Sequence, residues 1–349
     1  MKLKNTLYIC STYHHAIVTV AKCLSIKQNA DVILCDDIPK YEELQYRLLK
    51  SNVINHVYLF RRSKCPGYNP KEIMKRLFGR HSKHKKIIQN ELKVDFGRFD
   101  DIYIFHDGTK LGRYLMDIKC KYHLIEDGLD FFKVIKETPS YYMLEKYSGL
   151  SFIIRRLFNI GYIFCGQNKY CIDIEVNDLN GVVIPPKKVF EKSKKDLYSN
   201  LTISDKKILL QIFNTDSIQM TLYKKTALLL TIPLFEDKYV KTVDNQIKIY
   251  SDLINELKQD GYTVFIKAHP RDAIDYQSNF NDVIVLDRTV PTEIYNFDNS
   301  FRFDKAVSIN SSSIRTIANI GIKEPYGIDY LLKYPTFINS WVLDKIDGL

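Results

Sequence analysis

The chain has 349 residues, of which 45% are hydrophobic and 26% are charged, so it is too long for one small domain and too apolar for a disordered chain. Its formal net charge of +10 predicts attraction to an anionic partner, which could be a nucleic acid, an acidic membrane surface or a charged substrate. Seven cysteines lie scattered through mostly apolar stretches, which indicates reduced, buried thiols and a cytoplasmic protein.

The first half of the chain alternates short β-rich runs with stretches of helical spacing, which predicts a doubly wound parallel sheet. The β-rich runs are 6–11, 30–37, 56–60, 101–107 and 121–128, and the helical stretches include 17–27 and 41–51. Asp173-Ile174-Glu175 fits an alternating strand better than a metal-binding acidic motif. We find no secretory signal, and the longest apolar runs are about half of the roughly 20 residues that a membrane-spanning helix needs.

A second α/β series follows a less regular region. Between residues 150 and 225 we expect little regular structure, apart from a helix with Ser204 as its N-cap. The second series comprises the runs 226–235, 246–259, 262–270, 282–287 and 305–312. We therefore predict an acceptor-binding Rossmann-like domain over 1–190, a linker with helical character over 191–225, a nucleotide-sugar-binding Rossmann-like domain over 226–330, and a segment over 331–349 that packs back on the N-terminal domain. Repeats and coiled coils are excluded, because no internal repeat or heptad run occurs.

Three polar motifs follow predicted strands, where the ligands of open α/β sheets collect. The first is Glu126-Asp127-Gly128. A carboxylate in this position could be the general base that deprotonates an attacking hydroxyl, and the glycine permits the sharp turn that would expose it. An acidic β-turn would carry the same residues, as Asp107-Gly108 does after an earlier strand.

The second motif is Lys267-Ala268-His269-Pro270, directly after an alternating strand. The proline restricts His269 to extended backbone, and an imidazole held there could donate a proton to a leaving phosphate near neutral pH. Lys267 would lie on the same strand face and add positive charge. A loop histidine beside a solvated lysine is the alternative.

The third motif is Asn310-Ser311-Ser312-Ser313 before a helical pattern. Its hydroxyls and free backbone N–H groups could bind an anion, although ordinary helix capping would use the same residues. Between the second and third motifs, Glu293 follows a strand in a position to hydrogen-bond a ribose or a base.

The order and spacing of these motifs resemble the bacterial sialyltransferases of the lipooligosaccharide and capsule type, which are glycosyltransferase family 52-like and related to the polysialyltransferases. That group carries an acidic pair before glycine, then His-Pro, then a serine- or threonine-rich motif. The resemblance implies a GT-B fold, in which two Rossmann-like domains face each other across a cleft. It also implies CMP-sialic acid as donor, inversion at the anomeric carbon, and no metal or other cofactor.

Carried onto this sequence, the resemblance makes Glu126 the preferred base, with Asp127 as the second choice. His269 would protonate or stabilise the departing phosphate, with Lys267 adding positive charge. The further donor contacts would be Pro270, Glu293, Asn310, Ser311, Ser312 and Ser313. The glycan acceptor, from a capsule or lipooligosaccharide, would lie near Ser11, His14 and His15.

Two other functions fit part of this pattern. A CDP-glycerol-type or other nucleotide-sugar transferase would show the same second and third motifs. A non-catalytic basic protein that binds glycan or nucleic acid would account for the charge, but it leaves the three motifs unexplained, so we expect no nucleic-acid partner. The basic, apolar segment 150–166 is suited to an anionic membrane surface, which predicts peripheral binding at the inner face of the plasma membrane. The acceptor sugar, the linkage and the oligomeric state stay open.

Overall fold

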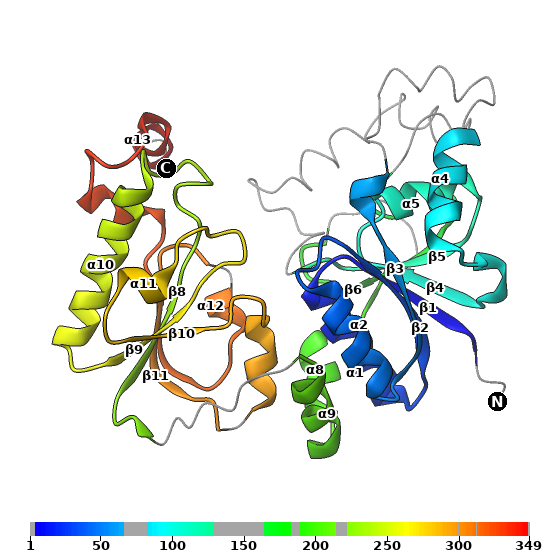
Figure 1. Cartoon of the computed structure of the whole chain (residues 1–349), viewed down its shortest axis with the longest axis horizontal. Coiled ribbons are helices and arrows are strands. Elements are labelled where there is room, and N and C mark those ends of the chain that lie inside the picture. Colours follow the sequence, from blue (N-terminus) through cyan, green and yellow to red (C-terminus); the bar gives the residue numbers. More distant parts are fainter. Residues whose placement is uncertain are drawn as a thin grey trace. The chain divides into compact units, whose positions relative to one another are not determined.

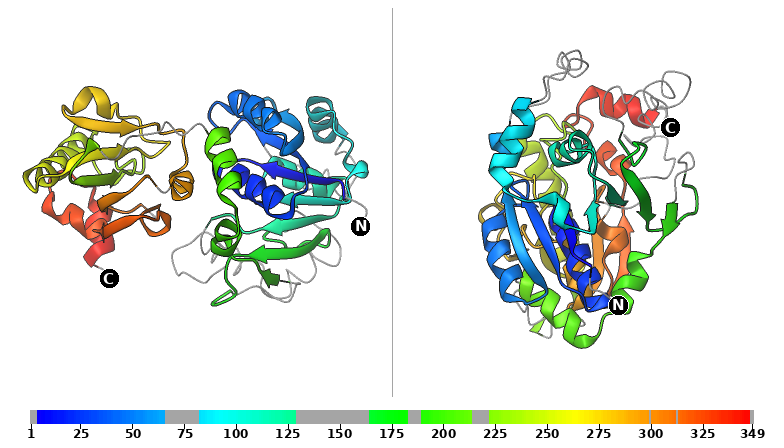
Figure 2. Two further views of the ribbon diagram at one scale, coloured as in Figure 1. Left: turned by 90° about the horizontal axis from the view of Figure 1, so that it is seen from below. Right: turned by 90° about the vertical axis from the view of Figure 1, so that its right-hand side faces the viewer.

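In a computed structural model, the chain forms two compact units, Met1–Ile212 and Phe213–Leu349, and each contains one parallel β-sheet flanked by helices (Figure 1). The structure describes residues 4–65, 82–128, 164–182, 189–213, 222–298, 300–311 and 313–347. Two further views show the strands of each unit gathered in a single twisted layer (Figure 2).

The sheet of the first unit has the strand order β3-β2-β1-β4-β5-β6-β7. Its strands are β1 (Thr6–Cys10), β2 (Ala30–Cys35), β3 (Ile54–Phe60), β4 (Asp101–Ile104), β5 (Tyr122–Ile125), β6 (Cys171–Val176) and β7 (Val189–Glu191). Its helices are α1 (Tyr13–Ile26), α2 (Tyr41–Lys50), α4 (Ser82–Leu92), α5 (Lys110–Asp117), α8 (Lys194–Ser199) and α9 (Ile203–Phe213), with 3-10 turns η1 (Arg62–Lys64) and η3 (Phe96–Arg98). The strand order reverses between β1 and β4, the point at which ligands bind in Rossmann-like sheets.

The second unit repeats this plan with the order β10-β9-β8-β11-β12. Its strands are β8 (Thr226–Leu230), β9 (Thr263–Lys267), β10 (Val283–Leu286), β11 (Phe303–Ser308) and β12 (Ile320–Pro325). Its helices are α10 (Val243–Gln259), α11 (Tyr276–Asn279), α12 (Ser313–Thr316) and α13 (Ser340–Asp347), with 3-10 turns η5 (Thr292–Phe297) and η6 (Ile328–Lys333). Here the order reverses between β8 and β11.

Local sequence accounts for the main elements. The central strands β1 and β8 are almost continuously apolar and buried, as expected when helices cover both faces of a parallel sheet. Helix α1 begins where the Thr12 side chain accepts the N–H of His15, and α10 begins where Thr242 accepts the N–H of Asn245.

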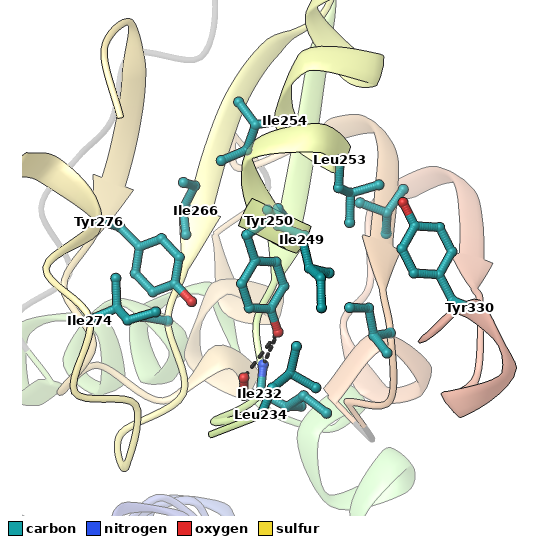
Figure 3. Close-up of a cluster of buried hydrophobic side chains, with 14 of the residues drawn as sticks. Ile232, Leu234, Ile249, Tyr250, Leu253, Ile254, Ile266, Ile274, Tyr276 and Tyr330 are labelled. Carbon is teal, nitrogen blue, oxygen red and sulfur yellow. Dashed lines mark hydrogen bonds between the residues drawn. The ribbon is translucent and has the colours of Figure 1, made fainter. Parts of the chain in front are cut away.

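The core of the second unit also fixes the loop that follows β8. Tyr250 of α10 is fully buried, and its hydroxyl donates to the carbonyl of Ile232 at 3.0 Å while accepting the N–H of the same residue at 2.8 Å (Figure 3). A buried phenol needs such partners. The contact holds the chain beside Thr231, which is part of the site described below.

The region between the two predicted series is more regular than expected. It contains β6, β7, α8 and α9, and β6 includes the predicted strand at Asp173–Glu175. The prediction of Ser204 as a helix cap is wrong: Thr202 accepts the N–H of Asp205 at 3.1 Å and the Asp205 carboxylate accepts the N–H of Thr202 at 3.0 Å. This reciprocal pair satisfies two donors that a serine at position 204 would leave unpaired.

The C-terminal segment packs within the second unit. Val342 is buried in the core of that unit, and the indole N–H of Trp341 donates to the carbonyl of Lys238 at 3.0 Å. Its packing on the N-terminal domain stays a prediction. The segment 150–166 lies almost entirely outside the described residues. Among the described helices, none combines the length and the apolar character that crossing a bilayer requires.

Candidate active site

The first candidate cluster lies at the carboxyl edge of the sheet in the first unit. Strands β1, β4 and β5 are neighbours, with Ile9 beside Ile104 and Ile104 beside Leu124. The residues that follow these strands, at Ser11, His106 and Glu126-Asp127, therefore meet at one edge. Helix α1 starts above the same edge and brings in His14 and His15.

His15 and Asp127 form a direct pair across β4. The distance from Nε2 of His15 to Oδ1 of Asp127 is 2.8 Å. The imidazole is 2% exposed, and its ring stacks on Phe105 with centroids 4.2 Å apart. The side chain of Asp127 is 29% exposed, and its Oδ2 has no hydrogen-bond partner within the described residues. Asp127 therefore keeps one oxygen for a ligand.

The ionisation of this pair favours a carboxylate beside a neutral imidazole. Burial lowers the pKa of His15, although the hydrogen bond with Asp127 opposes that effect. Burial alone would raise the pKa of Asp127, but the hydrogen bond from His15 and the nearby imidazoles outweigh it, so the net pKa is lowered. Asp127 is thus an ionised acceptor of hydrogen bonds near neutral pH.

Glu126 points in a different direction. It is 2% exposed, and its Oε2 accepts the backbone N–H of Asn177 at 2.6 Å. Its own N–H donates to the carbonyl of Glu175 at 2.8 Å, at the end of β6. Gly128 then turns the chain with φ of +83°, the left-handed conformation that glycine adopts most readily. Of the two predicted carboxylates, the one that reaches the surface is Asp127.

Sequence reasoning missed Lys194 as part of this cluster. From the first residue of α8, its Nζ lies 3.2 Å from the carbonyls of both Glu126 and Gly128, and 3.2 Å from Nε2 of His14. Burial and the charge of Lys194 lower the pKa of His14 to about 3. Lys194 therefore stabilises the turn at Glu126–Gly128 and keeps His14 neutral. Lys194 is one of the many basic residues of the chain, and no local pattern marks it.

The second cluster lies at the carboxyl edge of the other sheet. The N–H of His269 donates to the Thr231 hydroxyl at 3.3 Å, and Nδ1 of His269 accepts the N–H of Arg271 at 3.1 Å. Because Nδ1 is an acceptor, Nε2 carries the hydrogen. Nε2 has no partner in the described part of the chain. Burial and the charge of Arg271 lower the pKa of His269.

A buried carboxylate that the sequence analysis overlooked shapes the turn after His269. Asp272 is 1% exposed, and its N–H donates to the carbonyl of His269 at 2.9 Å. Its carboxylate accepts hydrogen bonds from the side chains of Thr231, Tyr276 and Gln246 and from the N–H of Ile274. The sequence feature that could have identified Asp272 is its position three residues after His269.

Lys267 is a buried ammonium group rather than a surface charge. It is 5% exposed, and its Nζ donates to the carbonyl of Asp287 at 2.9 Å, beyond the end of β10. Burial lowers its pKa to about 8, while the charges of Asp287 and Glu293 oppose this. Glu293 is half-buried at the start of η5.

The serine motif lies on the far side of β8 from His269. Lys267, Leu230 and Ser308 share one row across β9, β8 and β11, so the two motifs are separated by about two strand spacings, roughly 10 Å. The N–H of Ser311 donates to the Ser308 hydroxyl at 2.8 Å. Asn310 and Pro270 are exposed, whereas Ser311 and Ser313 are half-buried. Ser312 lies outside the described residues.

The structure thus gathers the predicted residues into two groups, one in each unit. The first unit holds Ser11, His14, His15, Glu126 and Asp127, and the second holds Lys267, His269, Pro270, Glu293, Asn310, Ser311 and Ser313. In the ranges that the structure describes, no three His, Cys, Asp or Glu side chains are grouped closely enough to hold a metal ion.

The family follows from comparison of the sequence with known families. Residues 67–317, more than half of the chain and including all three motifs, match the model of glycosyltransferase family 52. The chain belongs to glycosyltransferase family 52. This confirms the family expected from the motifs.

The chain also resembles one protein in sequence and others in structure. An uncharacterized protein of Haemophilus influenzae is 28% identical over 202 residues, which span 56% of this chain and 58% of that protein. The α/β-galactoside α-2,3-sialyltransferase of Photobacterium phosphoreum has a similar structure, with a TM-score of 0.52, 12% identity and coverage of 91% of this chain and 89% of that one. A sialyltransferase of Photobacterium damselae gives a TM-score of 0.49 at 13% identity.

The structural likeness confirms the predicted GT-B fold class of the family 52 enzyme, with two Rossmann-like sheets. At this level of identity it establishes the fold alone.

Proposed function

We propose that this family 52 enzyme transfers sialic acid from CMP-sialic acid to a hydroxyl of a surface glycan, with inversion and without a metal. The observation that carries the proposal is the pair of titratable groups at the two strand edges. Among the residues that the structure describes, nothing pairs with Oδ2 of Asp127 or with the Nε2–H of His269. A base and an acid are the two groups that this reaction needs.

Asp127, rather than the preferred Glu126, is our choice for the base. The acceptor hydroxyl attacks the anomeric carbon, a new C–O bond forms on the face opposite the phosphate, and the hydroxyl proton passes to Oδ2 of Asp127. Glu126 instead stabilises the turn, because its Oε2 accepts the backbone N–H of Asn177. A carboxylate that already accepts a buried backbone N–H would have to break that bond to reach a substrate.

His269 acts on the leaving group. When the bond between the anomeric carbon and the phosphate oxygen breaks, both electrons go to the oxygen, and the phosphate of CMP gains negative charge. The Nε2–H of His269 donates to that oxygen, while the buried charge of Lys267 contributes positive potential. His269 acts here as a neutral hydrogen-bond donor, because a second proton would have to enter at Nδ1, where the N–H of Arg271 already donates at 3.1 Å.

The remaining donor contacts follow from position along the sheet edge. Ser311, Ser313 and Asn310 follow β11 beside the reversal of strand order, where the phosphate is expected, and we retain Ser312 with them on sequence alone. Glu293 would bind the ribose or the base. For the acceptor, the galactoside named for the Photobacterium phosphoreum enzyme is the first compound to test, near Ser11 and His14.

The test is a direct assay of the purified enzyme with CMP-sialic acid, measuring CMP release and sialylated product with and without a β-galactoside. We expect turnover that persists in EDTA and falls at least about 100-fold in His269→Ala, with an unchanged thermal midpoint. Binding of CDP or UDP in preference to CMP, together with turnover of CDP-glycerol or a UDP-sugar, would exclude sialyl transfer and support the other transferases. Loss of turnover in EDTA that magnesium restores would refute metal independence.

A further inference from the structure

In the first turn of α1, both ring nitrogens of His15 form hydrogen bonds within the protein, which the predicted role in acceptor binding would not require. Nδ1 accepts the N–H of Ser11 at 3.1 Å, and Nε2 is 2.8 Å from Oδ1 of Asp127. Because a nitrogen that accepts an N–H carries no hydrogen, the hydrogen of the neutral ring lies on Nε2 and is donated to Asp127. Both ring nitrogens are thereby occupied inside the protein.

The ring has little freedom to leave this position. It is 2% exposed, and it lies parallel to the ring of Phe105, with 3° between the planes and 4.2 Å between the centroids. Its own N–H is bound by the Thr12 hydroxyl at 3.2 Å, which caps the helix. The backbone, the cap and the stacked ring therefore all fix the direction of the Nε2–H bond.

A second proton would disrupt this arrangement. It would have to enter at Nδ1, which faces the N–H of Ser11 at 3.1 Å, so two donors would oppose each other. The charged groups near the ring act in the same direction, since Lys194 and His106 both disfavour the imidazolium and burial disfavours it further. Asp127 is the group that opposes them.

We infer that His15 is a positioning residue, locked as the Nε2–H tautomer, whose donated hydrogen bond aims the Asp127 carboxylate. This inference rests on the proposed role of Asp127 as the base. It replaces acceptor binding by His15 with a role that acts through Asp127: Oδ1 is held, and Oδ2 is left to take the acceptor proton. A carboxylate free to rotate would lose this aim, and small errors in position cost up to about 100-fold in rate.

Two substitutions separate the hydrogen bond from the ring. His15→Phe keeps a ring to stack on Phe105 but has no donor, whereas His15→Gln places an amide N–H near the former Nε2. We expect kcat to fall about 10- to 100-fold in His15→Phe, with KM for the donor within about threefold, and to recover at least about fivefold in His15→Gln. His56→Phe is the matched control, because His56 pairs with Asp31 at the other end of the sheet, and we expect no change in activity.

The pH profile gives a readout that a merely structural role would not move. Without the donor, the pKa of Asp127 should rise, because burial is then less opposed, so the acid limb of kcat should shift to higher pH in His15→Phe. The other titratable groups facing His15 are His14 from α1, His106 beyond β4 and Lys194 from α8. These stay in place in both variants. An unmoved acid limb, or His15→Gln as inactive as a folded His15→Phe, overturns the inference.

A second measurement does not depend on turnover. Two-dimensional NMR of wild-type protein labelled with ¹⁵N-histidine should show His15 as the neutral Nε2–H tautomer at pH 7, with its resonances assigned through His15→Gln. An Nδ1–H tautomer or a charged ring would refute the inference. If the wild-type enzyme transfers no sialic acid, the proposed function fails in the activity assay, while the tautomer result still decides the geometry of His15.

Discussion

Exchanging each of the two acids for its amide tests which carboxylate is the base. In Asp127→Asn, the amide oxygen can still accept the Nε2–H of His15, now 2.8 Å from Oδ1, so the side chain should keep its place. The amide cannot take up the acceptor proton. We therefore expect kcat to fall about 10³-fold, within the range of about 10²–10⁴ for general base catalysis, which corresponds to about 4 kcal/mol of transition-state stabilisation.

Glu126→Gln should behave in the opposite way. Glu126 is 2% exposed and its Oε2 accepts the N–H of Asn177 at 2.6 Å, a contact that a glutamine keeps only if its amide oxygen, and not its NH₂ group, takes that place. We expect a loss of about 1–2 kcal/mol in the free energy of unfolding and less than about a tenfold fall in kcat.

The assay is the rate of CMP release at saturating donor and acceptor, measured beside urea unfolding for both variants. KM for CMP-sialic acid should stay within about threefold in Asp127→Asn, because the substitution leaves the donor site in the second unit unchanged. The reasoning is wrong if Glu126→Gln loses about 10³-fold in kcat while Asp127→Asn keeps near wild-type turnover. That result would require the Glu126 side chain to leave its buried bond and reach the substrate.

Three further predictions concern groups around the two clusters. Lys22→Met should lower the free energy of unfolding in urea by about 3 kcal/mol, because it leaves the buried Glu175 without the ammonium group that lies 2.6 Å from its oxygens. The double variant with Glu175→Leu should recover most of this loss. A double variant as unstable as the single one would refute the prediction. Asp272→Ala should lower the free energy of unfolding by at least about 3 kcal/mol, since four donors lose their acceptor. Its kcat should also fall, because the turn after His269 loses its support. Asp272→Asn keeps one acceptor oxygen, so it should be intermediate in both stability and kcat. The pKa of His14 is lowered to about 3 in the folded chain, whereas the unfolded chain binds a proton there below about pH 6.5. The free energy of unfolding should therefore fall as the pH drops from 6.5 toward 3. In His14→Gln the plot of this free energy against pH should be flatter over that range, and an unchanged plot would contradict the shift.

The parts of the fold that sequence alone could predict are those with strong local signals. Strands β1 and β8 are continuous apolar runs, and α10 has the spacing of a helix with one buried face. By contrast, β7 has three residues, none of them buried, and β12 is an edge strand with mostly exposed side chains. Neither presents a hydrophobic period, so their pairing with β6 and β11 could be found only from the folded chain.

The same division applies to the candidate site. The sequence marked both His15 and Asp127 as separate candidates, but their contact joins residues 112 positions apart and depends on the order of β1, β4 and β5. Lys194 gave no local signal at all, because a lysine at the start of a short helix is ordinary. The preference for Glu126 over Asp127 also had no local basis, since burial by β6 is a tertiary effect.

The two imidazoles follow one rule and differ in one respect, and their proposed roles rest on that difference. In each, a backbone N–H is donated to Nδ1, from Ser11 to His15 and from Arg271 to His269, at 3.1 Å in both cases. Each ring is thus left with its hydrogen on Nε2. In His15 that hydrogen meets Asp127 inside the unit, and the ring is buried, so it can act only on the carboxylate. In His269 the hydrogen has no acceptor in the described part of the chain, so a substrate oxygen is free to take it. In the proposed mechanism the buried donor of His15 orients a base and the open donor of His269 binds a phosphate, so exchanging the exposure of the two rings would abolish both roles.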